Sequence, residues 1–362
     1  MPDEHCGLNF ALSGQAVFQR LLSGRTILRP KNKLRLLRYT GASSLLPVKI
    51  AVLLSASFLI VGCSSPHSLE LKRLAGRPAL EYVGAWGTLG EDPGKLQNPV
   101  AMAVDRIGNI FLADVRKGST LIHKYDPHGH PLLSFYVDGC QHPSSIAIDW
   151  GGAIYLADRH TGTIYVYMPD GMLMKTIRHA AGRSLQDPAS LAVGFGGQLF
   201  ILESSANRVL KLDWLGRELK SWGSKGSEPG QFDLPSKVAL SEDGSLYVAD
   251  PGNRRVQKFS SDGDFIAQWS LAASDSLDQQ GADPEYSIAA SDKLVVASQS
   301  GYGQLEFWTS DGKPKASVND LLVRATLTPP LAQDVALTSK GELLLLDSTG
   351  SAPRILRFRV NF

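Results

Sequence analysis

Cysteine is scarce in this sequence. The 362 residues contain three cysteines, Cys6, Cys63 and Cys140, and no Cys-x-x-Cys pair. This scarcity excludes a disulfide framework, a dithiol redox site and the attachment of a c-type haem. Only Cys140 lies beyond residue 78, so no intrachain disulfide is expected there. A single thiol among strand-forming residues is predicted to be a partly buried structural residue.

The sequence also lacks a strong excess of one charge. Its formal net charge is +2 at pH 7, from 37 Lys and Arg and 35 Asp and Glu. Residues 1–49 hold eight of the basic and two of the acidic residues, which leaves a net charge of −4 for the rest of the chain. Phosphate recognition needs a concentrated positive surface. Nucleic acid is therefore not expected as the main partner.

No apolar run is long enough for a comfortable membrane span. Residues 50–62 form a run of 13 that follows Lys49 and ends directly before Cys63. That length is typical of the apolar core of an export signal. The run and its cysteine resemble a bacterial lipoprotein signal peptide, which implies lipidation of Cys63. An uncleaved signal anchor is the alternative, and both interpretations place the rest of the chain outside the cytoplasm.

The leader therefore divides into three predicted parts. Residues 46–62 are the lipoprotein signal peptide, and residues 63–78 are a polar tether. Residues 1–45 are either an unstructured extension or sequence upstream of a misassigned start. The protein is expected in the cell envelope, anchored by lipid to the outer or inner membrane and facing the periplasm or the outside.

A repeat fills the rest of the chain. An apolar strand followed by a polar residue recurs six times, at intervals of 44 to 49 residues, with end points at Asp114, Asp158, Glu203, Asp250, Ser298 and Asp347. A period of roughly 40–50 residues with several strands per copy is typical of a β-propeller. The prediction is an all-β, six-bladed β-propeller with four-stranded blades over residues 79–362. The recurring acid is expected to accept backbone N–H bonds in the loop that follows it, because a catalytic acid would be needed only once.

The two ends of this region are predicted to meet in one blade. The last copy stops after its third strand, at Phe362. Residues 79–86 (ALEYVGAW) share the aromatic ending of the fourth strands that end at Trp222 and Trp269. The N-terminal strand 79–86 should therefore complete the last blade and close the ring. Closure removes the exposed strand edges that favour aggregation.

The fourth copy has the most specific pattern, PGQFDLPSKVALSEDGSLYVADPGNRRVQKF at residues 229–259. It resembles the NHL repeat family, and the other copies extend the resemblance over residues 79–362. The resemblance implies a six-bladed propeller. It does not fix an activity, because scaffolds, hydrolases and lyases share this fold.

In a propeller, the loops between second and third strands lie on the same face as the segments that connect the blades. The candidate binding residues in these loops are Arg116, Lys117, Arg159, His160 and Arg254. For Arg254 and Arg208, pairing with the repeat acid is the favoured interpretation, whereas Arg116 and Arg159 are better candidates for contact with a partner. The leading hypothesis is a monomeric, non-enzymatic module without a cofactor. It would bind a protein or a polysaccharide outside the cytoplasm.

The alternative hypothesis is a metal-dependent hydrolase or lyase with one divalent cation, zinc or calcium, at the channel mouth. Metal-dependent lactonases and a zinc-dependent lyase resemble this fold. The candidate ligands are His142, His160 and Glu203. Zinc needs about three converging ligands, and the sequence has no HExxH, GxSxG or P-loop motif. The Gly-Phe-Gly-Gly run at 194–197 is predicted to be a structural turn.

Overall fold

The computed structural model describes residues 36–37, 79–271, 285–299, 304–318, 332–348 and 352–361. Across these residues the regular structure is β-strand, apart from one short 3-10 helix, η1 (Pro251–Asn253). The part of the chain that is described holds no helix long and apolar enough to cross a membrane. Cys63 and the predicted signal peptide at 46–62 lie outside the described residues.

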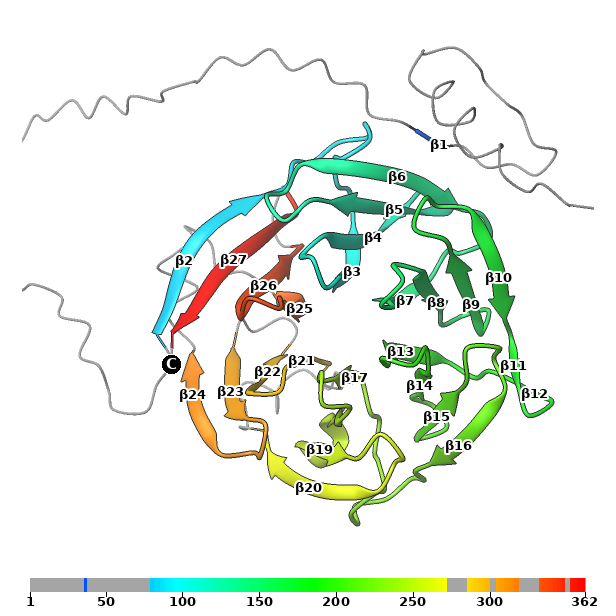
Figure 1. Ribbon diagram of the computed structural model, residues 1–362, viewed down its shortest axis with the longest axis vertical. Coiled ribbons are helices and arrows are strands. Elements are labelled where there is room, and N and C mark those ends of the chain that lie inside the picture. Colours follow the sequence, from blue (N-terminus) through cyan, green and yellow to red (C-terminus); the bar gives the residue numbers. More distant parts are fainter. Residues whose placement is uncertain are drawn as a thin grey trace, which may run out of the picture. The chain divides into compact units, whose positions relative to one another are not determined.

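The described strands form six four-stranded antiparallel blades around a ring (Figure 1). Blade one contains β3 (Pro99–Val104), β4 (Ile110–Arg116), β5 (Ser119–Tyr125) and β6 (Pro131–Val137). Blade two contains β7 (Pro143–Ile148), β8 (Ile154–Asp158), β9 (Thr163–Tyr167) and β10 (Leu173–Ile177). Blade three contains β13 (Pro188–Val193), β14 (Leu199–Glu203), β15 (Arg208–Leu212) and β16 (Glu218–Trp222).

The second half of the ring repeats this order. Blade four contains β17 (Lys237–Leu240), β18 (Leu246–Asp250), β19 (Arg255–Phe259) and β20 (Phe265–Ser270). Blade five contains β21 (Tyr286–Ala290), β22 (Leu294–Gln299), β23 (Leu305–Thr309) and β24 (Pro314–Val318). Blade six contains β25 (Ala332–Leu337), β26 (Glu342–Asp347), β27 (Arg354–Asn361) and β2 (Ala79–Trp86). Short extra strands are β1 (Leu36–Leu37), paired with β6, and the hairpin of β11 (His179–Ala180) and β12 (Arg183–Ser184).

Strand β2 closes the ring as the sequence predicts. It pairs antiparallel with β27, from Ala79 opposite Asn361 to Trp86 opposite Ile355. In Figure 1 the cyan β2 lies along the red β27, although the two are far apart in the sequence. The predictions of an all-β six-bladed propeller and of closure by the N-terminal strand are both confirmed.

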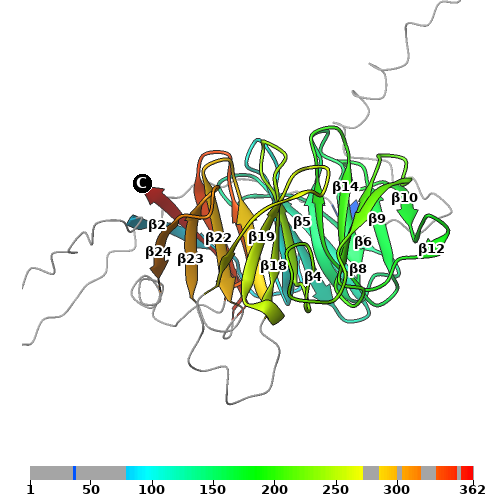
Figure 2. The same ribbon diagram turned by 90° about the horizontal axis from the view of Figure 1, so that it is seen from below.

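The strands run between two faces of the ring (Figure 2). We call the face with the second-to-third strand loops and the blade-connecting segments the loop face. The face with the first-to-second and third-to-fourth strand turns is the turn face. Strands β8, β14 and β18 are buried along their length, whereas β10 and β16 are largely exposed. The core therefore lies between neighbouring blades, as where Ile164 of blade two and Leu199 of blade three share one cluster.

Side chains on the first strands join neighbouring blades around the channel. They accept the backbone N–H of the next first strand, and the acceptors are Ser145, Ser190, Ser287 and Asp334. The last of them joins the final blade to the first, because Asp334 Oδ2 accepts the Met102 N–H at 2.9 Å. These bonds satisfy buried backbone donors that the sheets leave unpaired at the ring centre.

At the rim, an aromatic residue at the end of a fourth strand packs on a turn glycine of the next blade. The pairs are Trp86 with Gly129, Trp222 with Gly263 and Trp269 with Gly312. A Cβ on these glycines would lie 2.6, 2.6 and 2.5 Å from the ring atoms. Glycine is therefore required for the indole to contact the backbone directly.

We expect Gly263→Ala to lower the free energy of unfolding more than Gly341→Ala. Both glycines have φ of +76°, and nothing lies within 4 Å of a Cβ on Gly341. Each substitution should cost about 1–2 kcal/mol in backbone strain. Only at Gly263 does the new methyl group meet Trp222, which adds about 1–3 kcal/mol. Urea denaturation followed by circular dichroism measures both losses, and equal losses would contradict a tight Trp222 contact.

Candidate functional site

A buried acid at the end of the second strand organises the loop face of the described chain. These acids, Asp114, Asp158, Glu203, Asp250 and Asp347, are each 0% exposed. Asp114 accepts the N–H groups of Gln97 at 3.1 Å and Asn98 at 2.6 Å, in the segment that leads into its blade. Buried carboxylates need such donors, and Asp158, Glu203 and Asp250 accept an N–H in the same way. The repeated acid therefore accepts backbone N–H bonds as the sequence predicts, but mostly from the segment before the blade, and among the described residues only Asp158 also accepts them from the loop that follows it.

Asp158 shows the electrostatic consequence. Its carboxylate accepts the N–H groups of Gln141, His160 and Thr161, each at 2.9 Å. Burial by itself would raise the pKa of Asp158, but these backbone hydrogen bonds outweigh it and lower the pKa. The ionised acid holds the loop that presents Arg159 to solvent.

Two buried arginines add a second attachment for the connecting segments. Arg255 Nε lies 2.8 Å from Asp250, and Arg116 Nη2 lies 2.7 Å from Asp114. Both guanidinium groups also donate to backbone carbonyls. Arg255 donates to the carbonyls of Ser227, Glu228 and Gln231. Arg116 donates to those of Gly90 and Lys95. Each arginine therefore ties a connecting segment to its blade.

These contacts correct two expectations from the sequence. Arg116 is only 8% exposed, and its two terminal nitrogens donate to backbone carbonyls inside the protein, so it is not available to a partner. The residue that pairs with Asp250 is Arg255 and not Arg254, whose backbone turns to φ 50° at the end of η1. Arg208 does pair with its repeat acid, 2.5 Å from Glu203, as predicted.

His123 of β5 and Gln257 of β19 occupy equivalent places beside the repeat acid. His123 Nε2 lies 3.3 Å from Asp114 and Gln257 Nε2 lies 3.3 Å from Asp250. The other ring nitrogen of His123 lies 2.9 Å from Ser134 Oγ. Burial lowers the pKa of His123, so the neutral imidazole fills this place.

The remaining predicted binding residues are exposed on the loop face. Lys117 lies in blade one, Arg159 and His160 lie in blade two, and Arg254 lies in blade four. Arg159 is held most firmly, with Nε 2.7 Å from Asp187 and Nη1 3.9 Å from Glu285. The hydrogen bond that Arg159 donates to Asp187 raises the pKa of Arg159 and keeps it charged.

A cavity of about 380 Å³ opens at the channel mouth on the loop face. Its polar lining includes Ser144, Arg159, Ser204, Ser236, Lys237, Glu285, Tyr286 and Gln333. Lys237 Nζ lies 3.0 Å from Asp334, which is 1% exposed. Burial raises the pKa of Tyr286 to about 12, so its phenol remains a donor at neutral pH. The mouth thus offers fixed charges and hydroxyl groups to a polar ligand.

The predicted metal ligands come together only in part. The rings of His142 and His160 are exposed and lie 5.1 Å apart between centroids. Glu203 is buried and ion-paired with Arg208. Across the described ranges, no group of three or more His, Cys, Asp or Glu is placed to hold a metal ion. The pair of histidines is what the structure retains of the predicted zinc or calcium site.

Cys140, the thiol predicted to be structural, lies in the core. Cys140 is fully buried, and burial raises the pKa of its thiol to about 12, which makes it unreactive at neutral pH. His128 and His130 form a His-x-His run in the β5–β6 turn on the turn face. There His130 Nδ1 lies 2.9 Å from Asp126.

Sequence reasoning missed the charged pair inside the channel. Lys237 and Asp334 occupy the position at which Ser145, Ser190 and Ser287 occur in other copies. Aligning the copies shows both substitutions, so a signal was present. It did not reveal that Lys237 reaches across from blade four to blade six, because that contact depends on ring closure.

The NHL repeat family matches residues 232–259, in blade four. Human NHL repeat-containing protein 3 is 34% identical over 87 residues, which are 23% of this chain and 25% of that protein. Human E3 ubiquitin-protein ligase TRIM32 is 47% identical over 45 residues, which are 12% of this chain and 7% of that protein. The chain thus spans a quarter or less of the length of these two relatives.

Solved structures agree on the fold. A streptogramin B lyase superposes with a TM-score of 0.52 at 12% identity, covering 78% of this chain and 98% of that chain. Virginiamycin B lyase from Staphylococcus aureus gives 0.51 at 13% identity, covering 79% and 90%. The class defined by the described residues is the six-bladed β-propeller. Within this ring, the stretch of blade four at residues 232–259 matches the NHL repeat.

Replacing His123 with Gln should make stability less sensitive to acid. Burial lowers the pKa of His123, so the unfolded chain binds the proton more readily. Stability from the neutral ring is complete above the ordinary pKa of 6.5 and declines as the pH falls below it. Gln257 shows that glutamine fits beside the repeat acid.

Urea denaturation at pH 7.5 and 5.5 measures this effect. The wild type should lose about 1 kcal/mol more than His123→Gln between the two pH values. The exposed His128→Gln is the matched control and should behave like the wild type. Equal losses in wild type and His123→Gln would contradict the assignment.

Proposed function

We propose that this protein is an exported, lipid-anchored NHL-repeat propeller that binds a protein or glycan partner outside the cytoplasm without converting it. The observation that supports the proposal is the gathering of exposed cations on the loop face. There the exposed cations Lys117, Arg159 and Arg254 come from different blades. Together with the cavity at the channel mouth, they offer a partner both charge and shape.

The loop face is suited to binding because its polar groups are held in place. Arg159 is fixed by Asp187 and Glu285, and Lys237 is fixed by Asp334. Groups that are ordered before contact lose little conformational freedom when a partner arrives. The ring therefore serves as a preorganised platform at these positions.

The anchor is proposed from the leader alone. Lipidation of Cys63 would leave residues 63–78 as the tether between membrane and ring. Sixteen residues reach roughly 50 Å at full extension. A tether of this length would let the loop face meet partners within the envelope while the ring stays attached.

A metal-dependent hydrolase or lyase is the second candidate. The observation in its favour is the exposed pair of His142 and His160 on the loop face. Two imidazoles fall short of the three protein ligands of a catalytic zinc site. The lyases that share the fold do so at 12–13% identity, which supports the architecture only.

The double variant Lys117→Ala/Arg159→Ala should weaken partner capture. Cross-linking and pull-down from an envelope extract of the native host would measure it at two salt concentrations. Loss of two loop-face charges should reduce capture roughly tenfold at low salt and less at high salt. The control Lys293→Ala/Lys340→Ala removes two exposed charges from the turn face and should leave capture unchanged. Equal capture by all three proteins would refute binding through the loop face.

Intact-mass and metal analysis of protein purified from native membranes tests the anchor and separates the two candidates. We expect a chain that starts at an acylated Cys63, with zinc and calcium well below one ion per chain. An unmodified Cys63 would contradict the lipid anchor. A stoichiometric metal that is lost in His142→Ala and His160→Ala would favour the metal-dependent enzyme instead.

A further inference from the structure

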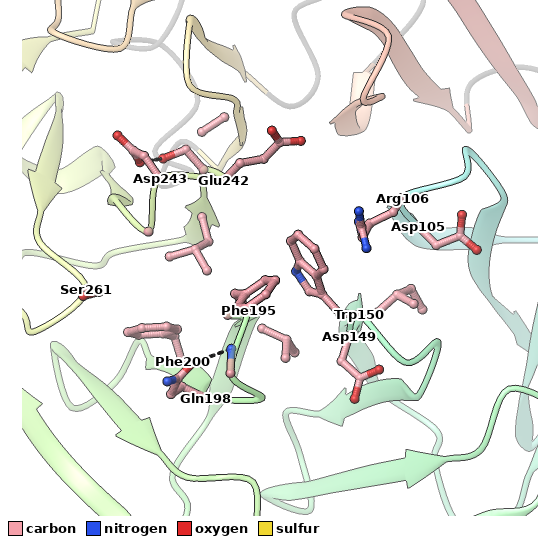
Figure 3. Close-up of a pocket in the computed structure, with 18 of the residues that line it drawn as sticks. Asp105, Arg106, Asp149, Trp150, Phe195, Gln198, Phe200, Glu242, Asp243 and Ser261 are labelled. Carbon is pink, nitrogen blue, oxygen red and sulfur yellow. Dashed lines mark hydrogen bonds between the residues drawn. The ribbon is translucent and has the colours of Figure 1, made fainter.

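Each first-to-second strand turn on the turn face has a second position that differs in residue type from blade to blade. In every first-to-second strand turn, we count residues from the end of the first strand. The first residue of the turn is the one that can cap it, and the second residue comes directly after it. These second residues are Arg106, Trp150, Phe195, Glu242, Asp292 and Ser339, in blades one to six. Because the repeat is a ring, all six positions surround the channel mouth on the turn face. The four in blades one to four are labelled in Figure 3.

The capping positions have a structural reason for their identity. Asp105 accepts the N–H groups of Ile107 at 3.0 Å and Asn109 at 2.8 Å. Asp149 accepts two N–H groups of its own turn in the same way. Such bonds stabilise the turn whatever residue stands second. In blades five and six the second residue bonds to a neighbouring turn, since Asp292 accepts the Asp243 N–H and Ser339 donates to the Arg106 carbonyl. The residue types of Trp150 and Phe195 need another explanation.

Two aromatic rings stand together at this mouth. Trp150 and Phe195 come from neighbouring blades, and their ring centroids lie 4.2 Å apart in an edge-to-face arrangement. They remain 42% and 73% exposed, so core packing does not account for them. The guanidinium of Arg106 lies over Trp150, 3.7 Å from the ring centroid. Figure 3 shows Arg106, Trp150 and Phe195 side by side at the cavity. Turn geometry does not explain an exposed Trp–Phe pair, which provides an apolar platform.

A cavity of about 570 Å³ adjoins this platform. This volume is within the range of about 300–1,000 Å³ that small-molecule sites occupy. Its lining includes Arg106, Gln198, Glu242 and Asp243, besides the two aromatic residues. The oxygen of the Gln198 amide accepts the Gly196 N–H at 3.1 Å, which leaves the NH₂ group as a donor.

The charges at the cavity select the chemistry of a ligand. Four acidic residues, Asp105, Asp149, Glu242 and Asp243, line it against two basic residues, Arg106 and Lys211, so its net negative charge disfavours an anion. A cation would find the face of Trp150 already covered by Arg106. A neutral polyhydroxyl ligand has no charge for the carboxylates to repel, and it can pack on Phe195, which is 73% exposed, and on the part of Trp150 that Arg106 leaves open. Its C–H face would pack on the aromatic rings, and its hydroxyl groups would find both donors and acceptors nearby.

We infer that the turn-face cavity is a second binding site, specific for neutral oligosaccharides, with Trp150 and Phe195 as the stacking platform. Arg106 and Glu242 provide hydrogen bonds at its edge. This site lies at the opposite end of the channel from the loop face. The inference therefore does not depend on the loop-face proposal, and either can fail without the other.

Isothermal titration of the full chain with neutral trisaccharides tests the inference. The probes are maltotriose, cellotriose, xylotriose, mannotriose and triacetylchitotriose, with trigalacturonate and a lysine tripeptide as charged comparisons. At least one neutral trisaccharide should bind. Trp150→Ala and Phe195→Ala should each weaken that binding about tenfold, as expected for loss of an aromatic anchor.

Trp214→Ala is the matched control. Trp214 is 63% exposed in the β15–β16 turn on the same face but does not line the cavity. It should leave sugar affinity unchanged, as should the loop-face variant Lys117→Ala/Arg159→Ala. Thermal unfolding confirms that each variant is folded. The inference is overturned if no neutral trisaccharide binds, if only a charged probe binds, or if Trp150→Ala and Phe195→Ala bind as tightly as Trp214→Ala.

Discussion

The buried carboxylate at the end of a second strand is the constraint on which the ring depends. A charge removed from water must be matched by donors, and the donors here are backbone N–H groups of the segment that enters the same blade. Asp114 and Asp158 show the arrangement, and in blades one and four Arg116 and Arg255 reinforce it. Blades one to four are thereby attached to their own connecting segments.

The need to satisfy buried polar groups also distinguishes residues that maintain the fold from residues that are exposed at the ends of the channel. Residues that cap turns or accept blade-joining hydrogen bonds are committed to the fold, and Ser190 and Asp149 are examples. The positions left free project at the two ends of the channel. On the loop face they include Lys117 and Arg159, and on the turn face they include Phe195. A propeller can therefore vary both ends without disturbing the packing between its blades.

Much of the fold could be predicted because its signals are local and repeated. The six strand endings gave the number of blades, and the aromatic ending of residues 79–86 indicated the closing strand. The candidate site was predicted less well. Arg116 and Arg255 stand on different strands and at different distances from their repeat acids, so no sequence spacing links them. Phe195 was interpreted only as part of a glycine-rich turn, because its neighbour Trp150 is 45 residues away in the sequence.

By itself the sequence determined the strand period, the turn positions, the closing strand and the scarcity of thiols, because each of these follows from residues close in the chain or from exact repetition. The tertiary structure decided which side chains meet. It buried Arg116, exposed Arg254, joined Lys237 to Asp334 across the channel and brought Trp150 to Phe195. The physical reason is that ring closure places equivalent positions of separate repeats around one axis. Contacts across that axis depend on blade geometry and side-chain reach, which no single repeat encodes.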